Sequence, residues 1–141
     1  MNERSTLNHV LMIANRSNET ARIESVAEKS EMKETKYRVV LVTCGTLEES
    51  RKIARAVVEK HLAACVNIVT HAVESFYMWE GKLENASEYL LVIKTSDERL
   101  EALKKEVLEM HSYDTPEFVA LPIASGAEAY LEWLGESVKN V

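Results

Sequence analysis

The sequence predicts an α+β protein whose elements follow the order β-α-β-β-α-β, with one further helix at the C-terminus. Three observations lead to this class. Two segments with the apolar period of amphipathic helices alternate with short apolar runs typical of strands. The two central runs are long and flank a turn. A polar region of different composition precedes all of them, so the 141 residues correspond to one domain with an extension.

The extension comprises residues 1–36, in which Ser, Asn, Thr, Glu and Lys dominate. Its six basic and six acidic side chains cancel, so the net charge of -6 lies entirely in residues 37–141. This composition predicts a flexible segment without a function of its own. Met32, close to the start of the folded region, leaves a second interpretation open, in which translation begins there.

The folded region begins with residues 37–44, a nearly continuous apolar run typical of a buried strand. Thr46 follows at a position suited to cap a helix that ends near His61. Acidic side chains occupy the first turn of this helix, where they interact favourably with the helix dipole.

The second half of the domain predicts a helix, a strand and a last helix. Ser96 or Asp97 caps the helix, whose apolar stripe comprises Leu100, Leu103, Val107, Leu108 and His111. Residues 118–123 form a strand that Pro122 places at an edge or a strand end. The last helix, about residues 127–138, is expected to pack through Tyr130, Leu131, Trp133 and Leu134. The complete order is that of a ferredoxin-like sandwich with a long hairpin and an extra C-terminal helix.

The central hairpin is expected to pair residues 65–79 with residues 88–95, around a turn at residues 80–85 in which Gly81 can take a positive φ. Its first arm would span roughly 50 Å if straight. A compact domain of about 100 residues has a diameter of roughly 34 Å, so the arm must bend or project. Apolar side chains fall on both faces, which predicts a β-bulge and burial against another copy of the chain.

Composition excludes several classes of function. The acidic balance, with a pI near 5.3, argues against nucleic-acid binding, which needs clustered basic residues. No apolar run is long enough to span a membrane. Two cysteines without a C-x-x-C pattern favour a reducing cytoplasm. No zinc spacing, phosphate loop or nucleophile elbow is present, and no nucleophile, base and orienting group can be named, so we expect no enzyme.

Two groups of residues could bind a ligand. Met110, His111 and Cys44 would together offer a thioether, an imidazole and a thiolate, a set suited to copper. Packing roles for His111 and Cys44 are the alternative interpretation. Glu88 and Lys94 lie on one face of their strand, where a charge is costly unless paired, so Lys94 needs a carboxylate or an anionic ligand.

Several short motifs together resemble the CutA divalent-ion tolerance family, from about Arg38 to the last helix. They comprise Thr43, Leu62 to Asn67, Tyr77 with Trp79 and Lys82, Lys94 with Thr95, His111 with Tyr113 and Glu117, and Tyr130 with Trp133. The resemblance implies a ferredoxin-like subunit in a homotrimer, with hairpins packed across subunits and a role in copper and divalent-metal tolerance. Copper-binding relatives use a cysteine and two consecutive histidines where this sequence has Thr43, Met110 and His111.

Two hypotheses follow from the residues and the resemblance. In the first, the chain is a non-enzymatic trimer that binds copper or another divalent metal through His111, Met110 and Cys44. In the second, it resembles the trimeric PII signalling proteins and binds an anion in an inter-subunit cleft. The residues expected to form that cleft are Tyr77, Trp79, Glu88, Lys94, Tyr113 and Glu117.

Overall fold

The computed structural model describes residues 16, 18–19 and 34–139, and its folded unit begins at Glu34. Met32 and most of the extension expected to be flexible lie outside the described residues. At the end of the extension the Thr35 backbone N–H donates to the Ile123 carbonyl, and the Lys36 carbonyl accepts from the Asp97 backbone N–H. The elements are β1 (Tyr37–Cys44), α2 (Leu47–Glu59), β2 (Cys65–Ile68), β3 (Val73–Trp79), β4 (Lys82–Ser96), α3 (Asp97–Met110), β5 (Val119–Pro122) and α4 (Glu128–Ser137).

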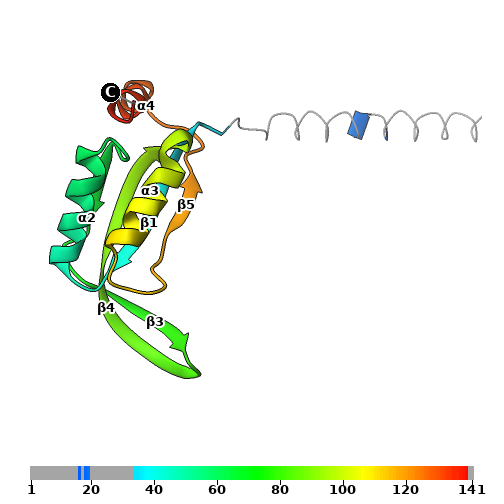
Figure 1. Ribbon diagram of the computed structural model, residues 1–141. Helices are drawn as coiled ribbons and strands as arrows, with labels where there is room; N and C mark the ends of the chain where they lie inside the picture. The colour runs from blue at the N-terminus through cyan, green and yellow to red at the C-terminus, as the bar shows by residue number, and fades with distance from the viewer. Residues whose placement is uncertain (1–15, 17, 20–33, 140–141) are drawn as a thin grey trace, which may run out of the picture. The chain divides into compact units, whose positions relative to one another are not determined.

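Strand β4 is the centre of an antiparallel sheet in the order β2-β4-β1-β5, with β3 pairing β4 beyond the end of β2. Its 15 residues pair successively with β3, β2 and β1. Helices α2 and α3 lie together on one face of the sheet, and the β3-β4 hairpin projects past the sheet's end (Figure 1). This arrangement confirms the predicted ferredoxin-like α+β class.

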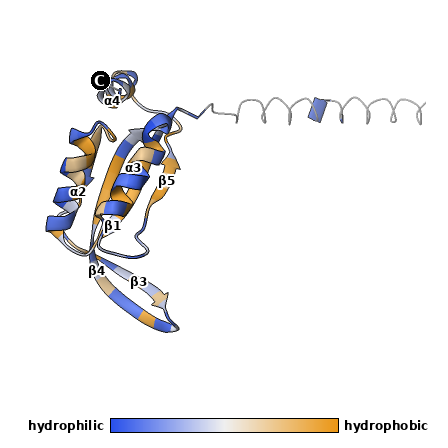
Figure 2. Ribbon diagram, in the orientation of Figure 1, coloured by the Kyte–Doolittle hydropathy of each residue, from blue (hydrophilic) through white to orange (hydrophobic). Residues whose placement is uncertain are grey.

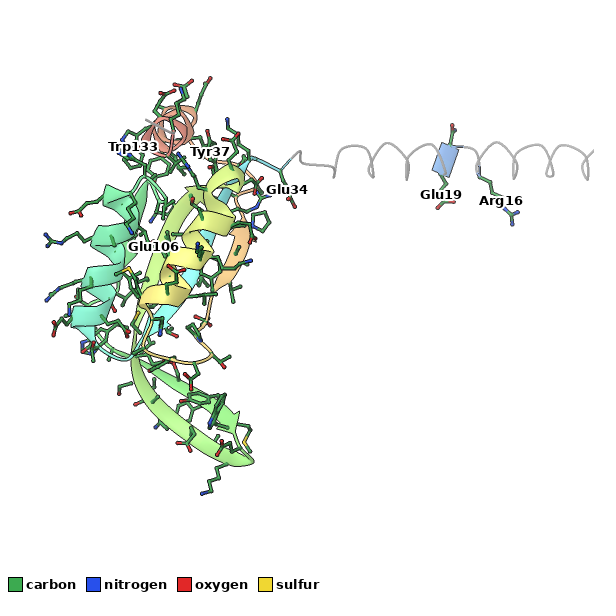
Figure 3. All side chains as sticks on the ribbon, viewed as in Figure 1. Arg16, Glu19, Glu34, Tyr37, Glu106 and Trp133 are labelled. Atoms are coloured by element: carbon green, nitrogen blue, oxygen red, sulfur yellow. The ribbon has the colours of Figure 1, made fainter. Side chains whose placement is uncertain are left out.

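The core fills the space between the two helices and one face of the sheet. Thr46 caps α2 by accepting a hydrogen bond from the Glu49 backbone N–H at 3.1 Å, as its sequence position predicted. The fully buried apolar side chains are Val40, Val42, Cys44, Ile53, Val57, Leu91, Ile93, Leu103 and Val107. Glu106 of α3 also pairs with Lys60 at the end of α2, which ties the two helices together (Figure 3). Leu108, predicted in the apolar stripe, is instead exposed.

The hairpin differs from the prediction in two places. Four residues, Val69 to Ala72, separate β2 from β3 and face only two residues of β4, so the first arm is interrupted by more than a one-residue bulge. The turn is also shorter than residues 80–85. It consists of Glu80 and Gly81, both at positive φ, which matches a two-residue hairpin turn. Residues 82–85 belong to β4 because each faces an aromatic or apolar partner on β3, and such cross-strand pairs stabilise a ladder.

Apolar surface remains outside the core. Phe76, Met78 and Leu83 on the hairpin are 63%, 64% and 69% exposed. The sheet face opposite the helices carries further apolar side chains, among them the exposed Val119 and Leu121 of β5. Figure 2 shows hydrophobic residues along β5 and interspersed along the hairpin.

Helix α4 packs at one end of the sheet, where Leu134 is buried with Tyr37, Ala64 and Val138. Its last turn contains no basic residue, but Arg99 donates to the Val138 carbonyl at 2.7 Å and His61 donates through Nδ1 to the Ser137 carbonyl at 3.1 Å. These donors satisfy carbonyls that a helix C-terminus leaves unpaired. Tyr130 and Trp133, expected to pack against the domain, instead contact each other with tilted rings, 5.4 Å between centroids, and both stay exposed. Within the described part of the chain, every helix is too short or too polar to cross a membrane.

Gly135 lets α4 approach Tyr37. A Cβ at this position would overlap the Tyr37 hydroxyl. Gly to Ala normally stabilises a helix by about 1 kcal/mol. We predict the opposite sign here: Gly135→Ala lowers the free energy of unfolding by about 1–3 kcal/mol, because the side chains must shift. Urea denaturation followed by circular dichroism measures it. The double variant Tyr37→Phe, Gly135→Ala removes the overlapping hydroxyl and is expected to recover stability. A stabilised Gly135→Ala would contradict the close approach.

Candidate functional site

Three elements bring metal-binding side chains together beside the core. Cys44 ends β1, Glu49 lies in the first turn of α2 and His111 caps the end of α3. One ligand atom from each of these residues lies within 4.8 Å of the others. We call these three residues the Cys44 cluster. The sequence predicted the pairing of Cys44 with His111 but missed Glu49, although its place one turn after the strand that ends in Cys44 was a usable signal.

Both nitrogens of His111 are already engaged. Nε2 lies 2.7 Å from the Thr43 carbonyl oxygen, which can only accept, so Nε2 carries the proton. Nδ1 accepts a hydrogen bond from the Tyr113 backbone N–H at 3.1 Å. The imidazole is therefore held as a neutral ring without a spare lone pair. Glu49 likewise accepts from the Ser112 backbone N–H at 2.6 Å.

The thiol of Cys44 is held in its protonated form. The pKa of Cys44 is raised from 9.0 to about 11, mainly by burial; a hydrogen bond with Ser50 partly opposes this rise, and the charges of Glu49 and Glu88 add to it. Because a thiolate rather than a thiol binds a metal, a cation in this cluster has to displace the proton of Cys44. It also has to replace one hydrogen bond of His111. The donor types thus suit a copper or zinc ion, while the arrangement shown is the proton-bearing form.

Met110, the third predicted metal ligand, faces another direction. Its side chain packs partly buried against the core and lines a shallow hollow beside α2, together with Arg55 and Ala56. Glu49 takes the place that the sequence analysis assigned to Met110. The reason is that residues 110 and 111 follow each other at the end of a helix, where successive side chains point to different sides.

A cleft of about 920 Å³ adjoins the Cys44 cluster. It lies between the hairpin and the segment that connects α3 to β5. Its lining comprises Thr43, Ser75, Phe76, Tyr77, Trp79, Glu84, Glu88, Ser112, Tyr113, Asp114, Thr115, Pro116 and Glu117. Five of the six residues predicted for a cleft are therefore gathered in it. Thr43 and Ser112 link the two sites, because each lines the cleft and bonds a member of the cluster.

The cleft is acidic. Four carboxylates line it, from Glu84, Glu88, Asp114 and Glu117, and no Lys, Arg or His is among the described lining residues. Glu88 is only 7% exposed, and its hydrogen-bond partner is the Tyr113 hydroxyl. Burial and then the charge of Glu88 raise the pKa of Tyr113, so this hydroxyl stays protonated and can donate. Such a site attracts cations rather than anions.

Gly45 gives the Tyr113 hydroxyl room to reach Glu88. A Cβ on Gly45 would lie 2.9 Å from the Tyr113 hydroxyl oxygen. The glycine that follows β1 is therefore part of the cleft's construction, a role that the sequence analysis did not assign to it. The one indication of this role in the sequence was the position of Gly45 between β1 and the cap of α2.

Lys94, the sixth predicted cleft residue, lies elsewhere. It is 9% exposed, and its ammonium donates to the Asn67 side-chain oxygen and to the Val92 carbonyl. Lys94 lies six positions from Glu88 along β4, or roughly 20 Å. Within one chain Lys94 therefore does not line the cleft. The anion site expected between subunits stays a prediction.

Comparisons with known proteins agree with the fold and the motifs. The model of the family described as CutA1 divalent ion tolerance protein matches residues 38–137. Protein CutA, chloroplastic, of Arabidopsis thaliana is 50% identical over 102 residues, which are 72% of this chain and 56% of that protein. Divalent-cation tolerance protein CutA of Archaeoglobus fulgidus is 42% identical over 103 residues, 73% of this chain and 99% of the relative. The chain thus spans about half of the plant protein's length.

Solved structures give the same result. The divalent cation tolerance protein Cut A1 of Thermus thermophilus superposes with a TM-score of 0.71 at 46% identity, covering 73% of this chain and 99% of the other. CutA1 of Oryza sativa superposes with a TM-score of 0.72 at 44% identity, covering 77% and 98%. A third structure, of the Archaeoglobus fulgidus protein, is described as periplasmic.

The raised pKa of Cys44 predicts a loss of stability in alkali. The unfolded thiol ionises near pH 9 and the folded one near pH 11. The neutral thiol therefore contributes its full stabilisation below pH 9 and loses it as the pH rises through 11, by up to about 2 kcal/mol. Urea denaturation at several alkaline pH values measures this change. Cys44→Val should remove that part of the pH dependence, and an identical pH dependence in the variant would contradict the assignment.

Proposed function

Because this chain belongs to the CutA1 divalent ion tolerance protein family, we propose that it is a divalent-cation tolerance protein that works without catalysis. It binds a divalent cation, copper or zinc by its donor types, at the Cys44 cluster. It does so as a homotrimer in which hairpins pack across subunits.

The observation that carries the metal proposal is the convergence of Cys44, Glu49 and His111. Among the described residues, this is the group of three His, Cys or acidic side chains whose ligand atoms come within 4.8 Å of one another. A thiolate and an imidazole with one carboxylate match the preferences of borderline and soft divalent metals. The adjoining acidic cleft supports the proposal, because its carboxylates raise the local concentration of cations.

Cation binding is expected to depend on pH. Because the metal displaces the proton of Cys44, the affinity for Zn²⁺ should rise by up to about tenfold per pH unit below the thiol's pKa. Calorimetry at about pH 6.5 and about pH 8.5, in two buffers of different ionisation enthalpy, measures the affinity and the proton released. We expect Cys44→Ser and His111→Ala to abolish this binding.

Two variants sharpen the metal experiment. Glu49→Gln keeps an acceptor for the Ser112 N–H but removes the charge, so it should weaken binding without unfolding the loop. His71→Ala, on the exposed segment between β2 and β3, is the matched control and should bind as the natural chain does. Unchanged affinity in the Cys44 and Glu49 variants would remove the cluster from the proposal.

The homotrimer is supported by the apolar surface that one chain leaves uncovered. Two helices cover one face of the sheet, while the opposite face and the hairpin carry exposed apolar side chains. A projecting hairpin with aromatic residues on both sides is stable in solution when another chain buries it. Tyr77 and Trp79 are residue types that anchor such interfaces. The number three comes from the family resemblance.

Light scattering on the purified protein tests the assembly. We expect a mass three times the 16.0 kDa of one chain. Met78→Lys or Leu83→Lys should shift the protein toward single chains, because burying an unpaired charge costs several kcal/mol. Leu108→Lys changes an exposed apolar residue on the helical side and should leave the mass unchanged. A natural chain that stays monomeric at micromolar concentration would contradict the proposal.

The proposed location is the cytoplasm. Both cysteines are free, and they lie on different faces of the sheet, one buried and one partly exposed. Unpaired thiols are typical of reducing compartments. Relatives are named as chloroplastic or periplasmic, so membership in the family does not by itself specify the compartment.

A further inference from the structure

Two buried charges of opposite sign lack a charged partner within the chain. Lys94 and Glu88 are 9% and 7% exposed, and no ion pair joins either of them to another described residue. Asn67 and Val92 satisfy two of the three donors of Lys94. Tyr113 donates to Glu88. Neutral partners of this kind relieve only part of the cost of burying a charge.

These two charges cannot pair inside one chain. They lie on the same face of β4, because their separation of six residues is even. That face is the one opposite α2 and α3, since Leu91 and Ile93 on the other face enter the helix-covered core. At roughly 20 Å, the distance exceeds the reach of the two side chains. Both residues lie within the continuous strand Lys82–Ser96, so an extended backbone separates them.

A second copy of the chain can satisfy both charges at once. The face that carries them is also the apolar face that the proposed assembly buries. In a closed symmetric assembly every copy presents the same two charges. Each Lys94 can then meet the Glu88 of a neighbour, and no copy retains an unpaired buried charge.

We propose that the cleft described above is completed between subunits, with the Lys94 ammonium of one copy pairing with the Glu88 carboxylate of the next. Glu88 is the partner because it is the buried carboxylate of the cleft. Glu84, Asp114 and Glu117 are exposed and retain water. The inference rests on the proposed assembly of copies and adds the residue contact that holds it in register. It also supplies the cationic residue that the cleft lacks within one chain.

A double-mutant cycle on the assembled protein tests the pair. Lys94→Met and Glu88→Gln each remove a charge at nearly constant volume. Each should raise the dissociation constant of the assembly by at least about tenfold, because the other charge is left buried and unpaired. The dissociation constant of the double variant should not exceed the larger of the two single-variant constants, because the double variant leaves no unpaired charge. Sedimentation over a concentration series measures all four proteins. Lys105→Met, on the exposed side of α3, is the control and should leave the constant unchanged.

The cycle separates the pair from its alternatives. The increases in dissociation constant caused by the two single variants could instead multiply in the double variant. Lys94 and Glu88 would then act independently, through Asn67 and Tyr113 of their own chain. That result would overturn the inference and leave the proposed assembly intact. A natural chain that never assembles would overturn both the assembly and the pair.

A charge exchange covers the case in which neutral variants fail to fold. Lys94→Glu and Glu88→Lys alone place like charges opposite each other across the interface and should block assembly. Combined in one chain, they restore opposite charges between neighbours and should recover the natural mass in light scattering. Since the two positions are too far apart within a chain, recovery in the combined variant can come only from contact between copies. Lack of recovery would count against the pair.

Discussion

The ladder of backbone hydrogen bonds along β4 is the constraint on which the structure depends. One strand of 15 residues pairs with β3, β2 and β1, so its register determines where every other strand lies. Because side chains alternate along a strand, the same register sends Leu91 and Ile93 into the core and leaves Glu88 and Lys94 on the opposite face. A slip of one residue would exchange these sets, burying two charges under the helices and exposing the core.

The length of β4 also explains why one chain leaves apolar surface exposed on the hairpin. The strand continues past the sheet and carries the hairpin beyond the reach of α2 and α3, as Figure 1 shows. Aromatic side chains on the hairpin therefore lie beyond α2 and α3 and stay exposed. The hydrophobic effect that forms the core acts equally on this surface, which is why we propose that other copies of the chain cover it.

The two candidate sites adjoin but have different electrostatic character. The Cys44 cluster combines a buried thiol, kept protonated by desolvation, with a buried imidazole whose two nitrogens both form hydrogen bonds. The neighbouring cleft is open and carries several carboxylates. A cation attracted by the cleft therefore lies close to soft ligands that become available only when a proton leaves. Thr43 and Ser112 connect the two sites, because each lines the cleft and forms a hydrogen bond with a member of the cluster. A change in one site therefore alters hydrogen bonds of the other.

Motifs that resemble those of the family, together with Glu88, supplied five of the six residues predicted for the cleft. The sequence by itself also determined the order of the elements, the cap at Thr46 and the projecting hairpin. These depend on local periodicity, capping and turn chemistry, which a short segment carries in itself. Only the tertiary structure decided that Glu49 joins Cys44 and His111, that Met110 does not, and that Lys94 lies far from the cleft. Glu49 and His111 come from different helices, and the position of Lys94 relative to Glu88 follows from the continuous, extended backbone of β4. Contacts of this kind depend on how elements pack and in which register, and no local pattern encodes them.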